Sequence, residues 1–368
     1  MNKLMFSYHE NRVDEIGKEI VETFAELAMD FRAGKSDTAE YKEKNAVLGE
    51  SIAKYCIEAT GREFTGMDQL KNPQIVTADA TFANRFAAVL SEAITPVVPA
   101  IISQEYTKLY DITQVGWGDA AKYTVESNEL FVVYDIAEGI LRQNQQTAFN
   151  TEYTVQASKK NISTFINWYT VAAGKFDFGK FGVKIAKSFQ AYIQAAVVNA
   201  MTKTINNAEA LGIGGYVKAG TDAKTWIELA QVVGAANASD VYALGTIGAL
   251  AKVTPDASTG FRFFENDDIL TKGFLKEYHQ VPMIQMDNAI RPDTLNANPE
   301  LLIQDDYIFF IPMGYNKPVK VAIEGDNVVV TTDHTTTKDC TLGLNISMYI
   351  GIDSIVGSKF GVLDVSED

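Results

Sequence analysis

The chain of 368 residues carries 47 acidic and 32 basic side chains, a formal net charge of −15, and 46% of its residues are hydrophobic. These values are typical of a folded globular protein and exclude a disordered or fibrous chain. The acidity argues against a protein that grips nucleic acid tightly, because such binding needs a basic face. With three histidines and two cysteines, a disulfide scaffold, a cysteine-built metal site and histidine-dependent catalysis are all disfavoured.

The length favours two or three domains, at about 100–200 residues per domain. Residues 1–10 lack the apolar run of a signal peptide. No stretch approaches 18 apolar residues, and the most apolar short run, 94–102, is interrupted by Pro96 and Pro99. We therefore expect a soluble protein that stays in the compartment where it is made.

Two acidic helices are predicted at the N-terminal end. Apolar residues at steps of three and four predict a helix over residues 11–33 that stops at Gly34. Asp37 and Glu40 resemble a capping box that begins a second helix, which runs to Gly61. The first 70 residues hold 9 basic and 14 acidic groups, a net −5, and their apolar faces need a partner.

A shorter helix is predicted over residues 79–93, after which Pro96 and Pro99 favour an extended connection. Strand-like sequence over 120–136 and 151–169 surrounds a polar stretch, 138–150. This pattern predicts a β-hairpin of about 50 residues that has little core of its own. Such a hairpin is more stable when it lies on another surface.

The strongest helical signal covers residues 178–207, where an apolar residue recurs at every fourth position. This helix contains Lys180, Lys184, Lys187 and Lys203 but no acidic residue. The lysines could face a polyanion or the acidic helices of a neighbouring chain. Alternatively, they form a solvated face opposite the apolar stripe.

The C-terminal half alternates helix and strand. A helix is predicted over 225–236, and strands over 240–244, 282–286 and 308–311. Residues 319–323 and 328–332 read as a hairpin around a turn at 324–327, followed by a last apolar strand over 341–352.

Chemical motifs are weak throughout. Asp333, His334, Asp339 and Cys340 are the densest group of potential metal ligands, but a loop after a hairpin explains them better than a zinc site. No serine lies in a Gly-x-Ser-x-Gly motif, and the glycines at 212–215 lack the Lys-Ser/Thr of a P-loop. We therefore predict no catalytic residue, no metal and no cofactor.

The order of these parts resembles the major capsid protein of tailed double-stranded DNA bacteriophages, which has the Hong Kong 97-type shell fold. The resemblance runs from about residue 75 and includes the final strands "GYNKPVKVAIEGDNVVVTT" and "NISMYIGIDSIVGSKFGVLDV". It implies an α+β fold with an N-terminal helical arm, an extended β-hairpin loop, a long spine helix in a peripheral domain, and an axial α/β domain.

The resemblance also implies domain boundaries. Residues 1–75 would be a helical arm or scaffold-like segment, 76–117 a connector and 118–165 the extended loop. Residues 166–207 and 311–368 would form the peripheral domain, and 208–310 the axial domain. We expect the arm to pack on neighbouring subunits, and a retained scaffold-like segment is the second interpretation.

In this family the coat subunit forms the shell without catalysis, and each extended loop lies across a neighbour. The implied function is thus a structural subunit of an icosahedral or prolate head shell around the phage genome, located in the virion after assembly in the host cytoplasm. Its partners would be copies of itself in pentamers and hexamers, packaged double-stranded DNA bound non-specifically, portal and scaffold proteins, and decoration proteins, with no membrane. The loop residues expected to contact other subunits are Tyr123, Glu126, Glu129, Phe131, Tyr134, Phe149 and Tyr153.

Lys122, Lys159 and Lys160 lie in the expected loop, but position alone does not support a covalent cross-link. Two alternatives stay open. One is an encapsulin-like nanocompartment that holds cargo proteins, and the other, more remote, is a soluble hydrolase whose aromatic loop binds substrate.

Overall fold

The computed structural model describes residues 14–76, 79–105, 110–126, 131–133, 135, 150–209, 214–253, 273–286, 288–291, 294, 298–314, 317–331, 341–354 and 359–366. Helices and β-sheets both occur, so the predicted α+β class is confirmed. The helical elements are α1 (Glu15–Arg32), α2 (Ala39–Ala59), η1 (Met67–Lys71), α3 (Pro73–Val76), α4 (Ala80–Glu105), α5 (Trp168–Ala172), α6 (Phe178–Asn206), η2 (Gly214–Tyr216), α7 (Ala223–Asn237) and α8 (Ile247–Lys252).

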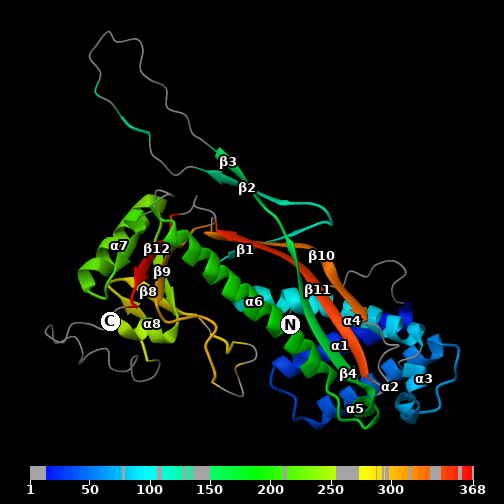
Figure 1. The fold of residues 1–368 in the computed structure, drawn as a ribbon. Coiled ribbons are helices and arrows are strands. Elements are labelled where there is room, and N and C mark those ends of the chain that lie inside the picture. The colour runs from blue at the N-terminus through cyan, green and yellow to red at the C-terminus, as the bar shows by residue number, and fades with distance from the viewer. Residues whose placement is uncertain are drawn as a thin grey trace.

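Within the described residues the strands build three sheets (Figure 1). A four-stranded sheet has the order β1-β10-β11-β4, from β1 (Tyr110–Val115), β10 (Val319–Thr331), β11 (Thr341–Ser354) and β4 (Ser158–Asn167). A six-stranded sheet has the order β5-β12-β9-β6-β8-β7, from β5 (Val217–Ala219), β12 (Gly361–Asp364), β9 (Tyr307–Pro312), β6 (Val241–Gly245), β8 (Val281–Gln285) and β7 (Glu277–Tyr278). The third is a ribbon of β2 (Ala121–Glu126) and β3 (Asn150–Val155).

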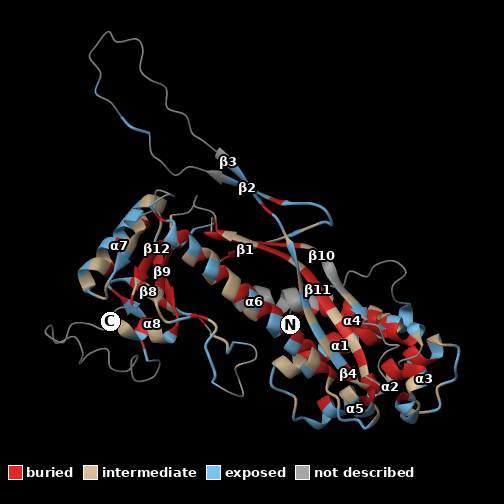
Figure 2. Cartoon of the chain, viewed as in Figure 1, coloured by how far each residue is buried: buried red, intermediate tan, exposed pale blue. Residues whose placement is uncertain are grey.

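The larger core lies between the four-stranded sheet and a layer of helices. Alternate residues of β11, such as Leu344 and Ile346, point into this core, where α4 and α6 cover the sheet. Figure 2 shows the buried residues gathered along β10 and β11 and on the helices beside them, whereas β4 at the sheet edge is largely exposed.

The six-stranded sheet is covered on both faces. Ile308, Phe310 and Leu363 pack with Trp226 of α7 in a separate core. Residues of the opposite face, such as Phe309 and Val362, belong to the larger core. Residues 311–368 were expected to lie with the spine helix, but β12 pairs with β9 and β5. The final strand of the chain thus returns to the sheet expected for the axial domain.

The N-terminal helices are part of the core of this chain. Phe24 and Leu27 of α1 are 1% exposed, and α1 packs on α4 and α6. Gly179 and Gly182 of α6 permit this close approach: a Cβ at Gly179 would lie 2.8 Å from the carbonyl oxygen of Leu27. The apolar faces of α1 and α2 thus find their partner within the subunit. The expectation that this segment packs on neighbouring subunits stays a prediction, which now concerns only its exposed faces.

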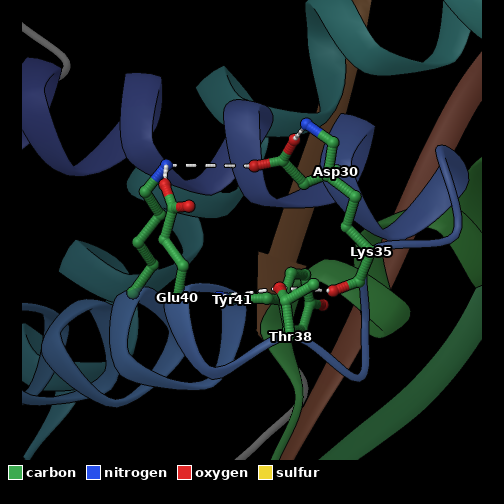
Figure 3. Close-up of polar contacts among 6 residues, drawn as sticks. Asp30, Lys35, Thr38, Glu40 and Tyr41 are labelled. Carbon is green, nitrogen blue, oxygen red and sulfur yellow. Dashed lines mark hydrogen bonds and ion pairs between the residues drawn. The ribbon is translucent and has the colours of Figure 1, made fainter.

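The turn between these helices is fixed by local polar contacts (Figure 3). Thr38, not Asp37, caps α2, and its Oγ1 accepts a hydrogen bond from the backbone N–H of Tyr41 at 3.2 Å. Asp30 of α1 pairs with Lys35 at 2.8 Å, and Lys44 of α2 lies 3.1 Å from Glu40. Exposed pairs of this kind add little free energy, so the buried face supplies most of the stability of the helical pair.

Polar contacts also join α2 to the start of α6. The Tyr41 hydroxyl donates to Asp177 Oδ1 at 2.6 Å, and Asn45 Oδ1 accepts from the backbone N–H of Phe178 at 3.0 Å. Asp177 in turn caps α6 by accepting from the backbone N–H of Lys180. The spine helix, predicted over 178–207 and confirmed at 178–206, thus begins on the N-terminal helices.

Two tyrosines make the stability of the subunit sensitive to alkaline pH. Burial raises the pKa of Tyr242, and burial together with the hydrogen bond to Asp177 raises the pKa of Tyr41. The unfolded chain releases these protons near the ordinary pKa of 10.0, whereas the folded chain keeps them. We expect the free energy of unfolding to fall above pH about 10, with a slope of about 1.4 kcal/mol per pH unit for each group. Denaturant titrations at a series of pH values in this range should show that the free energy of unfolding falls less steeply with pH in Tyr242→Phe. An unchanged dependence on pH would contradict the assignment.

Two local predictions are wrong for a shared reason. The helix predicted to end at residue 93 continues to Glu105 through Pro96 and Pro99, although an interior proline costs about 3 kcal/mol. Buried side chains at Leu90, Ala93, Ile94 and Val97 hold this helix on the core. The hairpin turn predicted at 324–327 is a bulge within β10, because β11 is long enough to pair with both halves. Tertiary packing overrides local propensity in each case.

Candidate assembly surface

A two-stranded ribbon projects from the body of the subunit (Figure 1). β2 and β3 pair in an antiparallel register from Ala121 opposite Val155 to Glu126 opposite Asn150. The extended loop was expected to reach residue 165, but residues 158–165 belong to β4, which pairs with β11. The ribbon therefore leaves the body between Ala121 and Val155.

The base of the ribbon is seated on the four-stranded sheet. Ala121 and Val155 bury against Ala322 of β10. Beside them, Lys320 is 5% exposed, forms an ion pair with Asp111 of β1, and places its ammonium nitrogen 5.5 Å from the ring centroid of Tyr123. Burial raises the pKa of Tyr123. The ammonium group is thus held between a carboxylate and an aromatic face, which offsets the cost of burying it.

Further contacts hold both sides of the base. The Tyr153 hydroxyl donates to Asp353 Oδ2 at 3.3 Å, and the charge of Asp353 raises the pKa of Tyr153. On the other side, the backbone N–H of Gly118 donates to Glu324 Oε1 at 2.8 Å. Contacts on both edges restrict the direction in which the ribbon points.

Trp117 packs over the bulge in β10, at the base of the ribbon. Its ring meets Tyr349 of β11 edge to face, with 5.2 Å between the ring centroids. Gly325 has a φ of +63°, and a Cβ at this position would lie 2.3 Å from the Trp117 ring. Only glycine fits there without displacing the tryptophan.

We expect Gly325→Val to lower the free energy of unfolding by about 1–3 kcal/mol, because the new side chain would be strained and would displace Trp117. Gly34→Val is the matched control: Gly34 also has a positive φ, +77°, but nothing lies near its Cβ direction. Denaturant unfolding should show the larger loss for Gly325→Val. Equal losses would mean that the Trp117 contact adds nothing.

The seven predicted loop residues divide into two groups. Tyr123 and Glu126 lie in β2, Tyr153 lies in β3, and Phe131 lies beyond β2. Glu129, Tyr134 and Phe149 lie outside the described residues. Phe131, Val132 and Val133 are 60%, 56% and 93% exposed. Tyr123 and Tyr153 instead turn toward the base, where they contact Lys320 and Asp353, so their part in contacts with other subunits remains a prediction.

The four predicted lysines are exposed on the spine helix. Lys180, Lys184, Lys187 and Lys203 project from α6, and none of them forms an ion pair with another residue that the structure describes. The structure does not bring Lys203 next to the other three, which lie more than three turns away along the helix.

Sequence reasoning missed the residues that seat the ribbon. Lys320 and Asp111 are 209 positions apart, and parallel pairing of β1 with β10 brings them together. The one local signal was the Gly116-Trp117-Gly118 segment, where the sequence changes from helical to strand-like. Gly325 lies in the turn predicted at 324–327, but its contact with Trp117 depends on the tertiary fold.

Potential metal ligands are scattered among the described residues. Within these ranges, no three His, Cys, Asp or Glu residues cluster in a way that could hold a metal ion. Asp333, His334, Asp339 and Cys340 lie outside the described ranges. No helix in the described part of the chain is long and apolar enough to span a membrane.

The chain was compared with known proteins. No protein-family model matches the sequence, and no curated protein is significantly similar to it. Among solved structures, the chain is similar to the capsid of an empty gene transfer agent particle, with a TM-score of 0.48 and 15% identity over 72% of this chain and 90% of the other. It is also similar to the capsid of cyanophage P-SCSP1u, with a TM-score of 0.46 and 12% identity over 72% and 88%. It is similar as well to a virus-like particle from Pyrococcus furiosus, with a TM-score of 0.41 and 11% identity over 74% of this chain and 98% of the other.

The solved structures in this comparison are two capsids and a virus-like particle.

Proposed function

We propose that this chain is a structural subunit that assembles with copies of itself into a closed icosahedral or prolate shell around double-stranded DNA. The projecting ribbon supports this proposal best. A two-stranded ribbon is only marginally stable alone in water. Here, exposed apolar side chains at Phe131, Val132 and Val133 follow β2, while the base is seated on Lys320, Asp353 and Glu324.

This combination is typical of an element that acts outside its own subunit. The seated base gives the ribbon a direction, and the apolar residues beyond β2 gain stability only when another surface covers them. A second copy of the chain is the surface that a shell supplies. Because every subunit makes such contacts, each contact can be weak and the particle is still held together.

The finer parts of the proposal follow from the resemblance. The particle would contain pentamers and hexamers, with the six-stranded sheet domain, expected over 208–310, around the symmetry axes. Packaged double-stranded DNA would be bound non-specifically, which suits a net charge of −15. Portal, scaffold and decoration proteins would complete a virion that assembles in the host cytoplasm. We assign the chain no catalytic role and no cofactor.

The direct test is negative-stain electron microscopy of the purified full chain, with sedimentation velocity on the same sample. We expect closed particles of uniform size. Monomeric material under all assembly conditions would contradict the proposal. The contents of particles isolated from their natural source separate two kinds of shell: packaged DNA supports a head shell, whereas cargo protein without DNA would indicate a nanocompartment.

A further inference from the structure

Two rows of opposite charge run along neighbouring helices. Glu15, Glu19, Glu22 and Glu26 recur at steps of four, three and four along α1, and all are exposed. Lys180, Lys184 and Lys187 recur at steps of four and three along α6, and all are exposed. Side chains at these steps share one face of a helix. We name these the glutamate row and the lysine row.

Close contacts fix how the two helices lie. Cβ atoms at Gly182 and Gly179 would meet the Phe24 ring at 2.9 Å and the Leu27 carbonyl oxygen at 2.8 Å. Phe24 is therefore level with Gly182, and Leu27 with Gly179, so α1 and α6 run antiparallel.

The rows point away from each other. Glu22 and Glu26 are each two residues from Phe24, which is about 200° around the helix axis. Lys180 and Lys184 stand in the same relation to Gly182. Each row therefore lies on the side of its helix opposite the partner helix, and the pair presents glutamates on one side and lysines on the other. In agreement, no ion pair joins Lys180, Lys184 or Lys187 to any residue within the described ranges.

The spacing of the two rows matches residue by residue. In an antiparallel arrangement the steps of four and three from Lys180 to Lys187 coincide with those from Glu26 back to Glu19. A second α1, placed antiparallel against the outer side of α6, would set Glu26 opposite Lys180, Glu22 opposite Lys184 and Glu19 opposite Lys187. The chain's own α1 already lies antiparallel on the inner side of α6, so the outer contact repeats the same relation.

We propose that the glutamate row of one copy lies against the lysine row of the next, in a head-to-tail contact between subunits. Complementary patches on opposite sides of one unit make heterologous contacts, which build rings when the rotation closes. The proposal rests on the proposed shell function and names one contact within it. Exposed ion pairs contribute little individually, so this contact sets direction and register more than strength.

A lysine row also attracts polyanions, but two observations favour a second copy. The chain as a whole is strongly acidic, which disfavours approach of a nucleic acid. The glutamate row matches the lysines in both spacing and sign, which a uniform phosphate backbone does not require. Binding of DNA is therefore treated as the competing outcome.

Charge reversal on the full chain tests the contact. We expect K180E/K184E/K187E and E19K/E22K/E26K each to reduce particle yield by about tenfold at about 0.1 M salt. The variant with all six changes should recover assembly, because its rows are again complementary. K203E/K218E/K224E, which makes the same charge change at exposed lysines outside the row, should assemble like the wild type.

Each outcome is decisive. Undiminished particle yield in both triple variants would overturn the contact while leaving the shell function intact. The contact is also overturned if K180E/K184E/K187E assembles normally but no longer retains a double-stranded DNA probe, and the lysine row would then serve a polyanion. If the variant with all six changes is folded, as shown by circular dichroism, but does not recover assembly, the contact is overturned as well.

A disulfide trap tests the contact without any need for complete particles. In E22C/K184C the two thiols face opposite sides of one subunit, so oxidation should link different chains into ladders of oligomers. E22C/K203C, which places one cysteine outside the lysine row, should form none. Absence of ladders in E22C/K184C would contradict the proposal even if the wild type makes no shells, whereas failure of the shell function alone would show as ladders without particles.

Discussion

A chain in which residues 124–152 are replaced by Asn-Gly is expected to fold normally and to form no closed particles. Tyr123 and Tyr153 are paired across the ribbon, and Asn-Gly favours the two-residue turn that would join them. The contacts of Tyr123 with Lys320 and of Tyr153 with Asp353 are kept. We expect the free energy of unfolding to change by less than about 1 kcal/mol, since the buried residues at the base of the ribbon, Ala121 and Val155, are kept.

A second variant keeps the length of the ribbon. In F131S/V133S two of the three exposed apolar side chains are removed, and we expect the free energy of unfolding to be unchanged and assembly to be weakened. Denaturant unfolding and electron microscopy on the same preparations separate folding from assembly. Normal particles from the shortened chain would show that the ribbon is dispensable, and unfolding of that chain would show that the ribbon is part of the core.

Loss of residues 1–76, which include α1 and α2, should unfold the subunit. We expect a chain that begins at residue 77 to lack cooperative unfolding, because Ile20, Val21, Phe24 and Leu27 are all buried in the larger core. At about 1.5–3 kcal/mol for each side chain, these four alone are comparable with the whole stability of about 5–15 kcal/mol. A trimmed chain that unfolds cooperatively would restore the interpretation of a separable arm.

A pair of point variants tests the same core without truncation. Phe24→Ala should lower the free energy of unfolding by about 3–5 kcal/mol, because its ring fills the space beside Gly182. Ile16→Ala, on the same helix but 63% exposed, should change it by less than about 0.5 kcal/mol. Both values come from denaturant titrations monitored by circular dichroism.

The sequence predicted the elements whose patterns are long and local. The spine helix follows from an uninterrupted four-residue repeat, and α1 and α2 follow from their amphipathic patterns and the stop at Gly34, whose φ is +77°. These signals depend on residues within a few turns of one another, and a sequence displays them directly.

The predictions were wrong where contacts between segments far apart in the sequence determine the local structure. The predicted end of α4 came too early, because the burial of its side chains on the core outweighs the destabilising effect of two interior prolines. The turn residues at 324–327 form a bulge because β11 is continuous opposite them. The apolar faces of α1 and α2 predict a packing partner, but nothing local indicates that α4 and α6 of the same chain provide it.

The candidate site shows the same division. That a projecting ribbon exists could be predicted from alternating apolar and polar residues around a polar stretch, although β2 ends at Glu126 and Phe131 lies beyond it. Its seating could not, since Lys320, Asp353 and Trp117 reach it only through sheet pairings that join the first and last thirds of the chain.

The measurement that tests the account most directly is cross-linking of the ribbon in assembled material. A photo-reactive amino acid at position 131 is introduced, and equal amounts of isotopically heavy and light chains are assembled together before irradiation. Mass spectrometry should find cross-links from residue 131 that join heavy to light chains, because the ribbon lies on a neighbouring copy. Cross-links confined to peptides of the same isotope composition would show that the ribbon folds back on its own subunit, and would contradict the account.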